Sequence, residues 1–353
     1  ANLTQGIAPK VAPVVLKAAN SGTASTDTTQ LLPALLGIKI VDRPQAVRAG
    51  GATGAGVVSD GADVPAAVLA VAQGYIGKPV SPKALDELVR DMVLAYRDAG
   101  QPVVNVLVPP QDITAGVVQI VAISGRLGRV TVTGAENPAA ITDGFALKPG
   151  DLLRDGPVLD QLRWTGRRAN VDVAGQYAPG ASFGTTDVAF DVKTGPQRSG
   201  FAGFDNSGSA AGVGQARIFA GLNYDGFLRP DDEVSYQVTT SEKGFKGLFA
   251  NVATYTMPFA PLPRTDVQFV LSYVTSESAG AGTTQGKDTQ LGVTFRSYLP
   301  TQGAVSADLS YGFTYKSANS DFLFGGATAS TTSTEMGLLS LDWAGSYNWR
   351  GLT

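Results

Sequence analysis

Two residue types are missing from this chain of 353 residues, which has no cysteine and no histidine. Without cysteine, neither a disulfide bond nor a thiolate metal site can form. Without histidine, the chain lacks the usual general base near neutral pH and the commonest transition-metal ligand. Three acids stand together at Asp231, Asp232 and Glu233, in a predicted turn, where a solvated cap is a better interpretation than a metal cluster. We therefore expect no enzyme, no cofactor and no metal site.

The chain is also poor in charge and in long apolar runs. Charged residues make up 16% of it, against about 25% in typical soluble domains. The net charge is −3 and no basic stripe is visible, whereas a nucleic-acid partner requires clustered Lys and Arg. No apolar run approaches the roughly 18 to 20 residues of a spanning helix. We expect no nucleic-acid partner, and any passage through a membrane must use a β-barrel.

Glycine, in contrast, is abundant, with 43 residues. Two glycine-rich segments, 49–63 and 281–289, invite comparison with phosphate-binding loops. The first lacks the Gly-Lys-Ser/Thr ending that places a lysine on phosphate. In the second, Ala281 replaces the first glycine and Asp288 follows Lys287 where a hydroxyl is needed. We interpret the first as a flexible loop and the second as a loop between strands.

Residues 1–30 predict a short helix, Pro9–Ala19, and then a polar linker. Residues 31–129 predict the order strand, helix, helix, strand, strand. The second helix is the clearest element, because Ser81 is a good N-cap, Pro82 suits the first turn and Gly100 supplies a stop. The other elements expected in this region are strand Leu36–Val41, helix Val64–Tyr75, and strands Val103–Val108 and Val117–Ile123.

Residues 130–196 predict the same order in a shorter form. Its last two strands form a hairpin around a turn at Pro179 and Gly180. The expected elements are strand Val130–Val132, helices Ala139–Leu147 and Val158–Arg167, and strands Val171–Tyr177 and Asp187–Val192.

From residue 197 to 353 the pattern is β throughout, with about eight alternating runs. They lie at 200–206, 215–223, 234–239, 248–256, 266–275, 290–298, 305–315 and 335–343. In the clearest run, Leu309, Tyr311 and Phe313 share one face, and Ser306, Asp308, Ser310 and Thr314 share the other. Most runs have about 9 to 11 residues, the length of a tilted membrane strand. We predict a transmembrane antiparallel barrel, with a soluble β-sandwich as the alternative.

Two segments resemble a known family. The run from Tyr96 to Gly134, YRDAGQPVVNVLVPPQDITAGVVQIVAISGRLGRVTVTG, resembles the first POTRA domain of transporters from bacterial two-partner secretion systems. The hairpin with Pro179 and Gly180, followed by Phe204, Asp205, Asn206, Ser207 and Gly208, resembles the start of their barrel. This is the TpsB family of haemolysin and haemagglutinin exporters, within the outer-membrane-protein-85 superfamily.

The resemblance implies α+β POTRA domains (βααββ) at 31–129 and 130–196, and a barrel from 197 onward. In this family an N-terminal helix plugs the lumen of a 16-stranded barrel. The chain would then hold the N-terminal part of a longer barrel. It also implies Pro179, Gly180, Asp205 and Asn206 as a structural motif at the junction.

The resemblance further implies a location in the bacterial outer membrane, with the POTRA domains in the periplasm. The expected partners are outer-membrane lipids and a secreted, TpsA-like exoprotein that passes through the barrel while unfolded. A barrel-assembly insertase and a passive porin are the alternatives. We predict that the exoprotein adds a strand to an exposed POTRA edge. The candidate residues are Val103, Val104, Asn105, Val106 and Leu107 on one edge, and Val171, Val173 and Tyr177 on another.

Overall fold

The computed structural model describes residues 25–206 and 213–347. The predicted helix Pro9–Ala19 and two residues of the predicted barrel start, Ser207 and Gly208, lie outside these ranges. The chain divides into two compact units, one of residues 1–193 with 301–303 and one of the rest. Within the described ranges, no helix is both long and apolar enough to cross a membrane.

The first sheet has one strand more than the sequence predicts. Its strands are β1 (Gly37–Val41), β2 (Gly56–Asp60), β3 (Val104–Leu107) and β4 (Val117–Ser124), in the order β2-β1-β4-β3. Strand β1 is parallel to both β2 and β4, whereas β3 is antiparallel to β4. A single-turn 3-10 helix, Pro44–Ala46, lies between β1 and β2.

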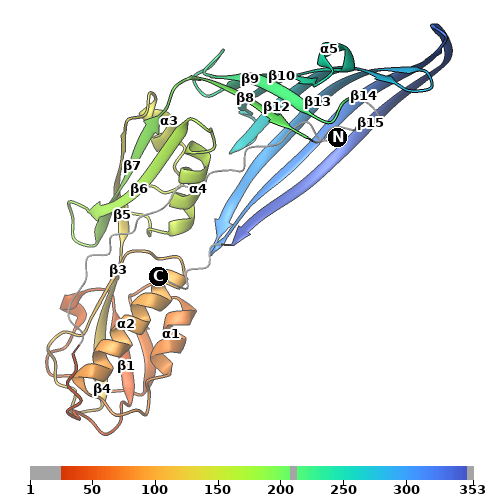
Figure 1. The fold of residues 1–353 in the computed structure, drawn as a ribbon. Coiled ribbons are helices and arrows are strands. Elements are labelled where there is room, and N and C mark those ends of the chain that lie inside the picture. The colour runs from red at the N-terminus through yellow and green to blue at the C-terminus, as the bar shows by residue number, and fades with distance from the viewer. Residues whose placement is uncertain (1–24, 207–212, 348–353) are drawn as a thin grey trace. The chain divides into compact units, whose positions relative to one another are not determined.

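Two helices, α1 (Ala66–Gln73) and α2 (Pro82–Asp98), pack on one face of this sheet (Figure 1). Helix α2 begins and ends as its sequence predicts. The Ala84 N–H donates to Ser81 Oγ at 3.2 Å, and Gly100 follows the helix with φ of +80°. Leu88, Met92 and Tyr96 are buried in the core that α2 shares with β1, β3 and β4.

The prediction of a flexible loop at 49–63 is wrong, because this segment contains β2 and is tied to the sheet. The buried Gln119 side chain donates from Nε2 to the Arg48 carbonyl at 2.8 Å and accepts from the Arg48 N–H at 3.0 Å. Val117 and Val121 are also buried, although they lie outside the helix-facing core. Both faces of β4 are therefore covered.

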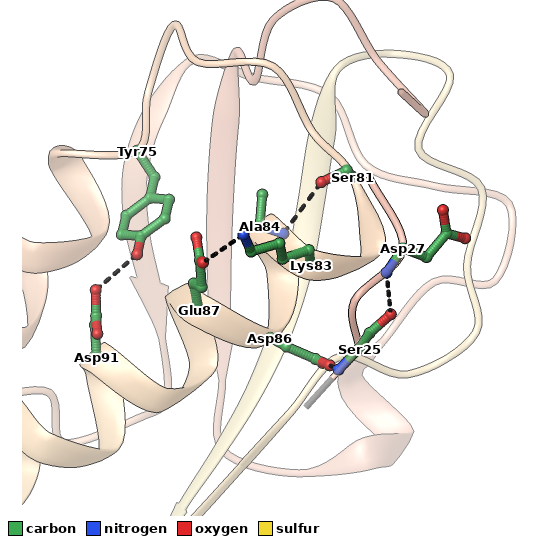
Figure 2. A network of polar contacts seen from close by, with 9 residues as sticks. All are labelled: Ser25, Asp27, Tyr75, Ser81, Lys83, Ala84, Asp86, Glu87 and Asp91. Carbon is green, nitrogen blue, oxygen red and sulfur yellow. Dashed lines mark hydrogen bonds and ion pairs between the residues drawn. The ribbon is translucent and has the colours of Figure 1, made fainter. Parts of the chain in front are cut away.

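Part of the predicted linker is fastened to the beginning of α2 (Figure 2). The Ser25 N–H donates to Asp86 Oδ2 at 2.6 Å, and the Lys83 N–H donates to the Asp27 carbonyl at 3.0 Å. Further along, Leu32 forms an isolated antiparallel bridge with Val80. Of these contacts, the Lys83 N–H bond uses a helix N-terminal donor that has no partner within the helix.

The second α/β domain has strands β5 (Arg126–Thr133), β6 (Val171–Pro179) and β7 (Thr185–Thr194), with helices α3 (Pro138–Asp143) and α4 (Asp155–Thr165). Their order in the sheet is β5-β7-β6, and β5 is parallel to β7. Its core contains an edge-to-face pair, Phe145 and Phe190, with ring centroids 5.7 Å apart. This is the predicted βααββ order.

The second unit contains an eight-stranded sheet, in agreement with the predicted strand count. Its strands follow one another in space as in sequence, with β8 and β15 at the two edges. They are β8 (Arg198–Asp205), β9 (Arg217–Asp225), β10 (Glu233–Ser241), β11 (Leu248–Pro258), β12 (Thr265–Ala279), β13 (Thr283–Gln302), β14 (Val305–Phe324) and β15 (Ala327–Tyr347). A four-residue helix that the sequence analysis missed, α5 (Gly244–Gly247), precedes β11.

The loop expected at 281–289 is wrong, and two other intervals between the predicted strands are shorter than the runs indicate, because the strands continue into them. The polar segment between β12 and β13 is reduced to residues 280–282, so most of 281–289 is strand rather than loop. The segment between β14 and β15 is reduced to Gly325 and Gly326, both with positive φ. The turn before β14 is reduced to residues 303–304. These polar, Ser- and Thr-rich segments are therefore largely strand.

The two faces of the eight-stranded sheet differ in the way that the alternation predicts. Register places Tyr255 beside Phe269 and Phe313 beside Leu339 on one face. On the other face, Arg296 pairs with Asp308 at 2.7 Å, and Ser310 lies opposite Asp342. One face is therefore apolar and the other carries ion pairs.

Candidate partner-binding edges

Strand β3 lies at the edge of the first sheet, with β4 as its neighbour. Of the candidate residues, Val104, Asn105, Val106 and Leu107 form the strand. Val103 lies just before it, and its carbonyl accepts from the Gly125 N–H at 2.9 Å. The strand after the second helix was expected at a sheet edge, and β3 lies at one.

The hydrogen-bond pattern shows which main-chain groups of β3 point away from the sheet. Val104 is opposite Ser124 and Asn105 is opposite Ile123, so Val103 is opposite Gly125. Because Gly125 donates to Val103, that pair is of the hydrogen-bonded type, and the types alternate along an antiparallel ladder. Asn105 therefore directs its N–H and C=O toward β4, whereas Val104 and Val106 direct theirs outward.

The side chains of this edge are anchored in the domain. Val106 belongs to the core and Val104 packs against it, whereas Asn105 is exposed. None of the residues from Val103 to Leu107 is titratable. Recognition at this edge would therefore depend on main-chain groups and apolar contact, not on the protonation state of the edge.

Strand β6 is the edge of the second domain's sheet, beside β7. Val171 and Val173 are buried in its core, and Tyr177 packs against that core. Asp172 and Gln176, which alternate with them, are exposed. The two candidate edges belong to different sheets.

The predicted junction motif divides into two parts. Pro179 ends β6, and the Gly180 N–H donates to the Thr185 carbonyl at 2.9 Å, which closes the turn before β7. A side chain at Gly180 would collide with Thr185. Asp205 ends β8 opposite Arg217, and Asn206 is the next residue. The role of these four residues as a junction motif stays a prediction.

Sequence reasoning missed the buried role of Asp232. Its side chain is fully buried rather than solvated, although it does cap the predicted turn. Its carboxylate accepts from the N–H groups of Phe227, Leu228 and Arg229 and from the Tyr255 hydroxyl, which donates at 2.7 Å. An Asp five residues after the start of a Phe-Leu-Arg-Pro turn was the available signal, since aspartate commonly accepts from turn N–H groups.

Sequence reasoning also missed β2, which lies at the outer edge of the first sheet. The signal was weak, because Gly56–Asp60 holds only two valines among glycine and polar residues. Strand β5 forms the outer edge of the second sheet. The two domains together therefore present four edges, two of which were predicted as binding edges.

Residues 57–125 match the protein family described as "POTRA domain, ShlB-type". Among curated relatives, the outer membrane transporter CdiB-2 of Burkholderia pseudomallei is 29% identical over 150 residues, which are 42% of this chain and 26% of the relative. The heme/hemopexin transporter protein HuxB of Haemophilus influenzae is 23% identical over 181 residues, 49% of this chain and 31% of the relative. The chain thus spans about a quarter to a third of the length of these relatives.

Solved structures of CdiB have a similar fold. The Escherichia coli protein aligns with a TM-score of 0.64 and 17% identity, over 95% of this chain and 59% of that one. The Acinetobacter baumannii protein aligns with a TM-score of 0.56 and 13% identity, over 88% of this chain and 59% of that one. The eight-stranded sheet and the α/β domains before it are features of that fold.

Proposed function

Because this chain belongs to the two-partner secretion transporters of the bacterial outer membrane, the TpsB family with a ShlB-type POTRA domain, we propose that it exports a protein partner. The partner is a secreted, TpsA-like exoprotein that is still unfolded when the POTRA domains receive it in the periplasm. It then crosses the outer membrane through the barrel to which the eight-stranded sheet contributes. The family consists of transporters, not enzymes.

The outward main-chain groups of β3 are the observation that carries this proposal. Val104 and Val106 direct their N–H and C=O groups away from the sheet. An extended chain can pair with such groups without a defined sequence, which suits the export of a long polypeptide. An edge of this kind is an aggregation hazard unless it is covered or used. Strand β6 is the corresponding edge of the second sheet.

The sheet suits a membrane on one face and a polar passage on the other. Strands β8 to β11 have 8 to 11 residues, close to the roughly 9 to 11 that cross a bilayer. Strands β12 to β15 have 15 to 21 residues, and their added lengths are rich in Ser and Thr. We infer that the apolar face meets lipid and that the polar ends of these hairpins extend beyond the hydrocarbon layer.

The two alternative functions fit less well. A passive porin has no need of periplasmic α/β domains with open edges. The curated relatives reported above are transporters rather than barrel-assembly insertases. Both alternatives also differ from export in what they predict for a partner protein, which neither would release into the medium.

Co-expression tests the proposal. The full-length protein is expressed with the product of the neighbouring gene, and that product is measured in the culture medium. We expect the partner in the medium with the wild type, and a marked loss with Val104→Pro, which removes an outward donor. Val104→Ile keeps the N–H and serves as the control. A partner that reaches the medium without this protein would contradict export, and normal export by a folded Val104→Pro variant would contradict capture at β3.

A further inference from the structure

We propose that β2 is an intramolecular guard strand, which fills in cis an edge of β1 that could otherwise take up an extended segment of the exported partner. This inference rests on the proposed function, since it concerns the same mode of capture. It assigns a role to the strand that the first domain has in addition to the βααββ order.

A comparison of the two POTRA sheets shows which edge is filled. In the second sheet, the first strand β5 is parallel to β7 and forms one edge of the order β5-β7-β6. In the first sheet, β1 has the corresponding place, parallel to β4 in the order β1-β4-β3. There, however, β2 pairs with the other side of β1 over five residues, from Gly37 opposite Gly56 to Val41 opposite Asp60.

The hydrogen-bond pattern shows that β2 saturates the main chain of β1. The Gly56 N–H donates to the Leu36 carbonyl at 2.9 Å. On the other side of β1, the Gly37 N–H donates to the Gly116 carbonyl at 3.2 Å, next to β4. Since successive residues of a strand point their main-chain groups to opposite sides, Ile38 and Ile40 direct theirs toward β2.

The same reasoning separates the residues of β2. Gly56, Val58 and Asp60 face β1 with their main-chain groups, whereas Val57 and Ser59 face outward. Side-chain anchorage of the strand is slight: Val57 packs against the core, but Val58 is 55% exposed, and Ser59 and Asp60 are exposed as well. The Asp60 carboxylate pairs with Lys39 at 2.9 Å. Main-chain pairing thus holds β2 more than burial does, which suits a strand that imitates an added peptide.

The loop before β2 fixes its register. Gln119 holds the Arg48 main chain, and the Asp112 N–H donates to the Ala49 carbonyl at 2.9 Å. These bonds fix the chain shortly before β2, so β2 has little freedom to shift its register along β1. The guard strand is therefore covalently part of the domain and is held next to β1 by its loop. An incoming chain would have to displace β2 although this loop keeps it close to β1.

Hydrogen exchange on the full-length protein in detergent tests the proposal, with an acetylated decapeptide of alternating valine and threonine as probe. Val58→Pro removes a donor to β1, and Ser59→Pro is the matched control on the outward side. We expect the amides of Ile38 and Ile40 to exchange about tenfold faster in Val58→Pro and to be unchanged in Ser59→Pro. Addition of the peptide should restore their protection in Val58→Pro. In the wild type, the peptide should leave these amides unchanged.

Three results would overturn the guard. The first is full protection of Ile38 and Ile40 in both Val58→Pro and the double variant with Asp60→Pro. The second is faster exchange that the peptide does not reverse, and the third is peptide protection of Val57 and Ser59 in the wild type, which would make β2 itself a binding edge. Protection of Val104 and Val106 by the peptide reports capture at β3 separately, so failure of the guard and failure of the proposed capture are distinguishable.

Discussion

The two units of the chain use apolar side chains in opposite ways. In the first unit, Ile120 and Phe190 are buried between sheet and helices. In the eight-stranded sheet, Leu339 and Leu341 are 87% and 74% exposed. The period-2 alternation of a strand is common to both units, so it reports which face is apolar without reporting what covers that face. In the sheet, the cover is the membrane that we propose.

Both units bury polar residues. In the sheet unit, they include Asp232, Asp266 and Asp308. In the first unit, Gln119 holds a loop to the sheet through Arg48, and Asp187 pairs with Arg129 between β5 and β7. A polar interior with an apolar exterior is what a membrane barrel requires, because its lumen is wet and its outside is not.

The largest effect should come from a truncation in the first unit. Ile120→Ala leaves a cavity in a close-packed core, and we expect it to destabilise the POTRA domain by about 2 to 5 kcal/mol. Leu341→Ala on the sheet should cost less, because lipid can fill the space. Hydrogen exchange of the strands around each site in the full chain measures both, and equal costs would break the contrast between the units.

A charge on the apolar face should come next. Leu309→Arg is expected to cost roughly 2 to 4 kcal/mol near the bilayer midplane, whereas Ser310→Arg on the opposite face should be mild. Folding into lipid bilayers from denaturant measures the two variants side by side. Similar penalties for both would show that the faces do not meet different solvents.

A buried carboxylate in the sheet unit gives a smaller effect. Asp232→Ala leaves the N–H groups of the turn and the Tyr255 hydroxyl without their acceptor. We expect a loss of about 1 to 3 kcal/mol in the stability of the β9–β10 hairpin, measured by exchange of its amides. Asp231→Ala, at the exposed neighbour, is the control and should have little effect. An equal response of the two would assign Asp232 to the solvated surface.

The smallest effect is a pH dependence in the first unit. Partial burial, together with donation to Asp91 at 2.7 Å, raises the pKa of Tyr75 to about 12. A raised pKa in the folded state means that this stabilisation is present below about pH 10, the unfolded value, and is lost as pH rises toward 12. Urea unfolding of wild type and Tyr75→Phe should therefore differ below pH 10 and converge above it. A constant difference across this range would contradict the assignment.

Elements with local sequence signals were predicted correctly. The prediction failed for elements that form only because of tertiary contacts. Ser81 and Pro82 start α2 and Gly100 ends it through local backbone and capping preferences, so the limits of this helix could be predicted. Strand β2 forms because β1 offers it a partner and Gln119 holds its loop, and neither contact is visible in the glycine-rich sequence. The full lengths of β12 to β15 were not predicted, because their Ser- and Thr-rich ends lack the alternation of apolar residues that indicates a strand.

Of the candidate site, the sequence predicted the edges but not their orientation. Because main-chain groups alternate along a strand, only one of Asn105 and Val106 can direct its groups outward, and the register with β4, together with the Gly125 bond to Val103, identifies Val106. Partner binding by these residues, and the domain boundaries at 30, 129 and 196, stay predictions.

Trp343 provides the most direct test of the contrast between the units, because it lies on the exposed apolar face of β15 opposite Leu309. The measurement is quenching of its fluorescence by brominated lipids, in full-length protein in which every other tryptophan, Trp164 and Trp349 included, is replaced by Phe. We predict strong quenching and blue-shifted emission. In the matched variant, Trp343→Phe with Asp342→Trp, the fluorophore moves to the polar face and quenching should be lost. Equal quenching at the two positions would contradict the assignment of one face to lipid and the other to a polar passage.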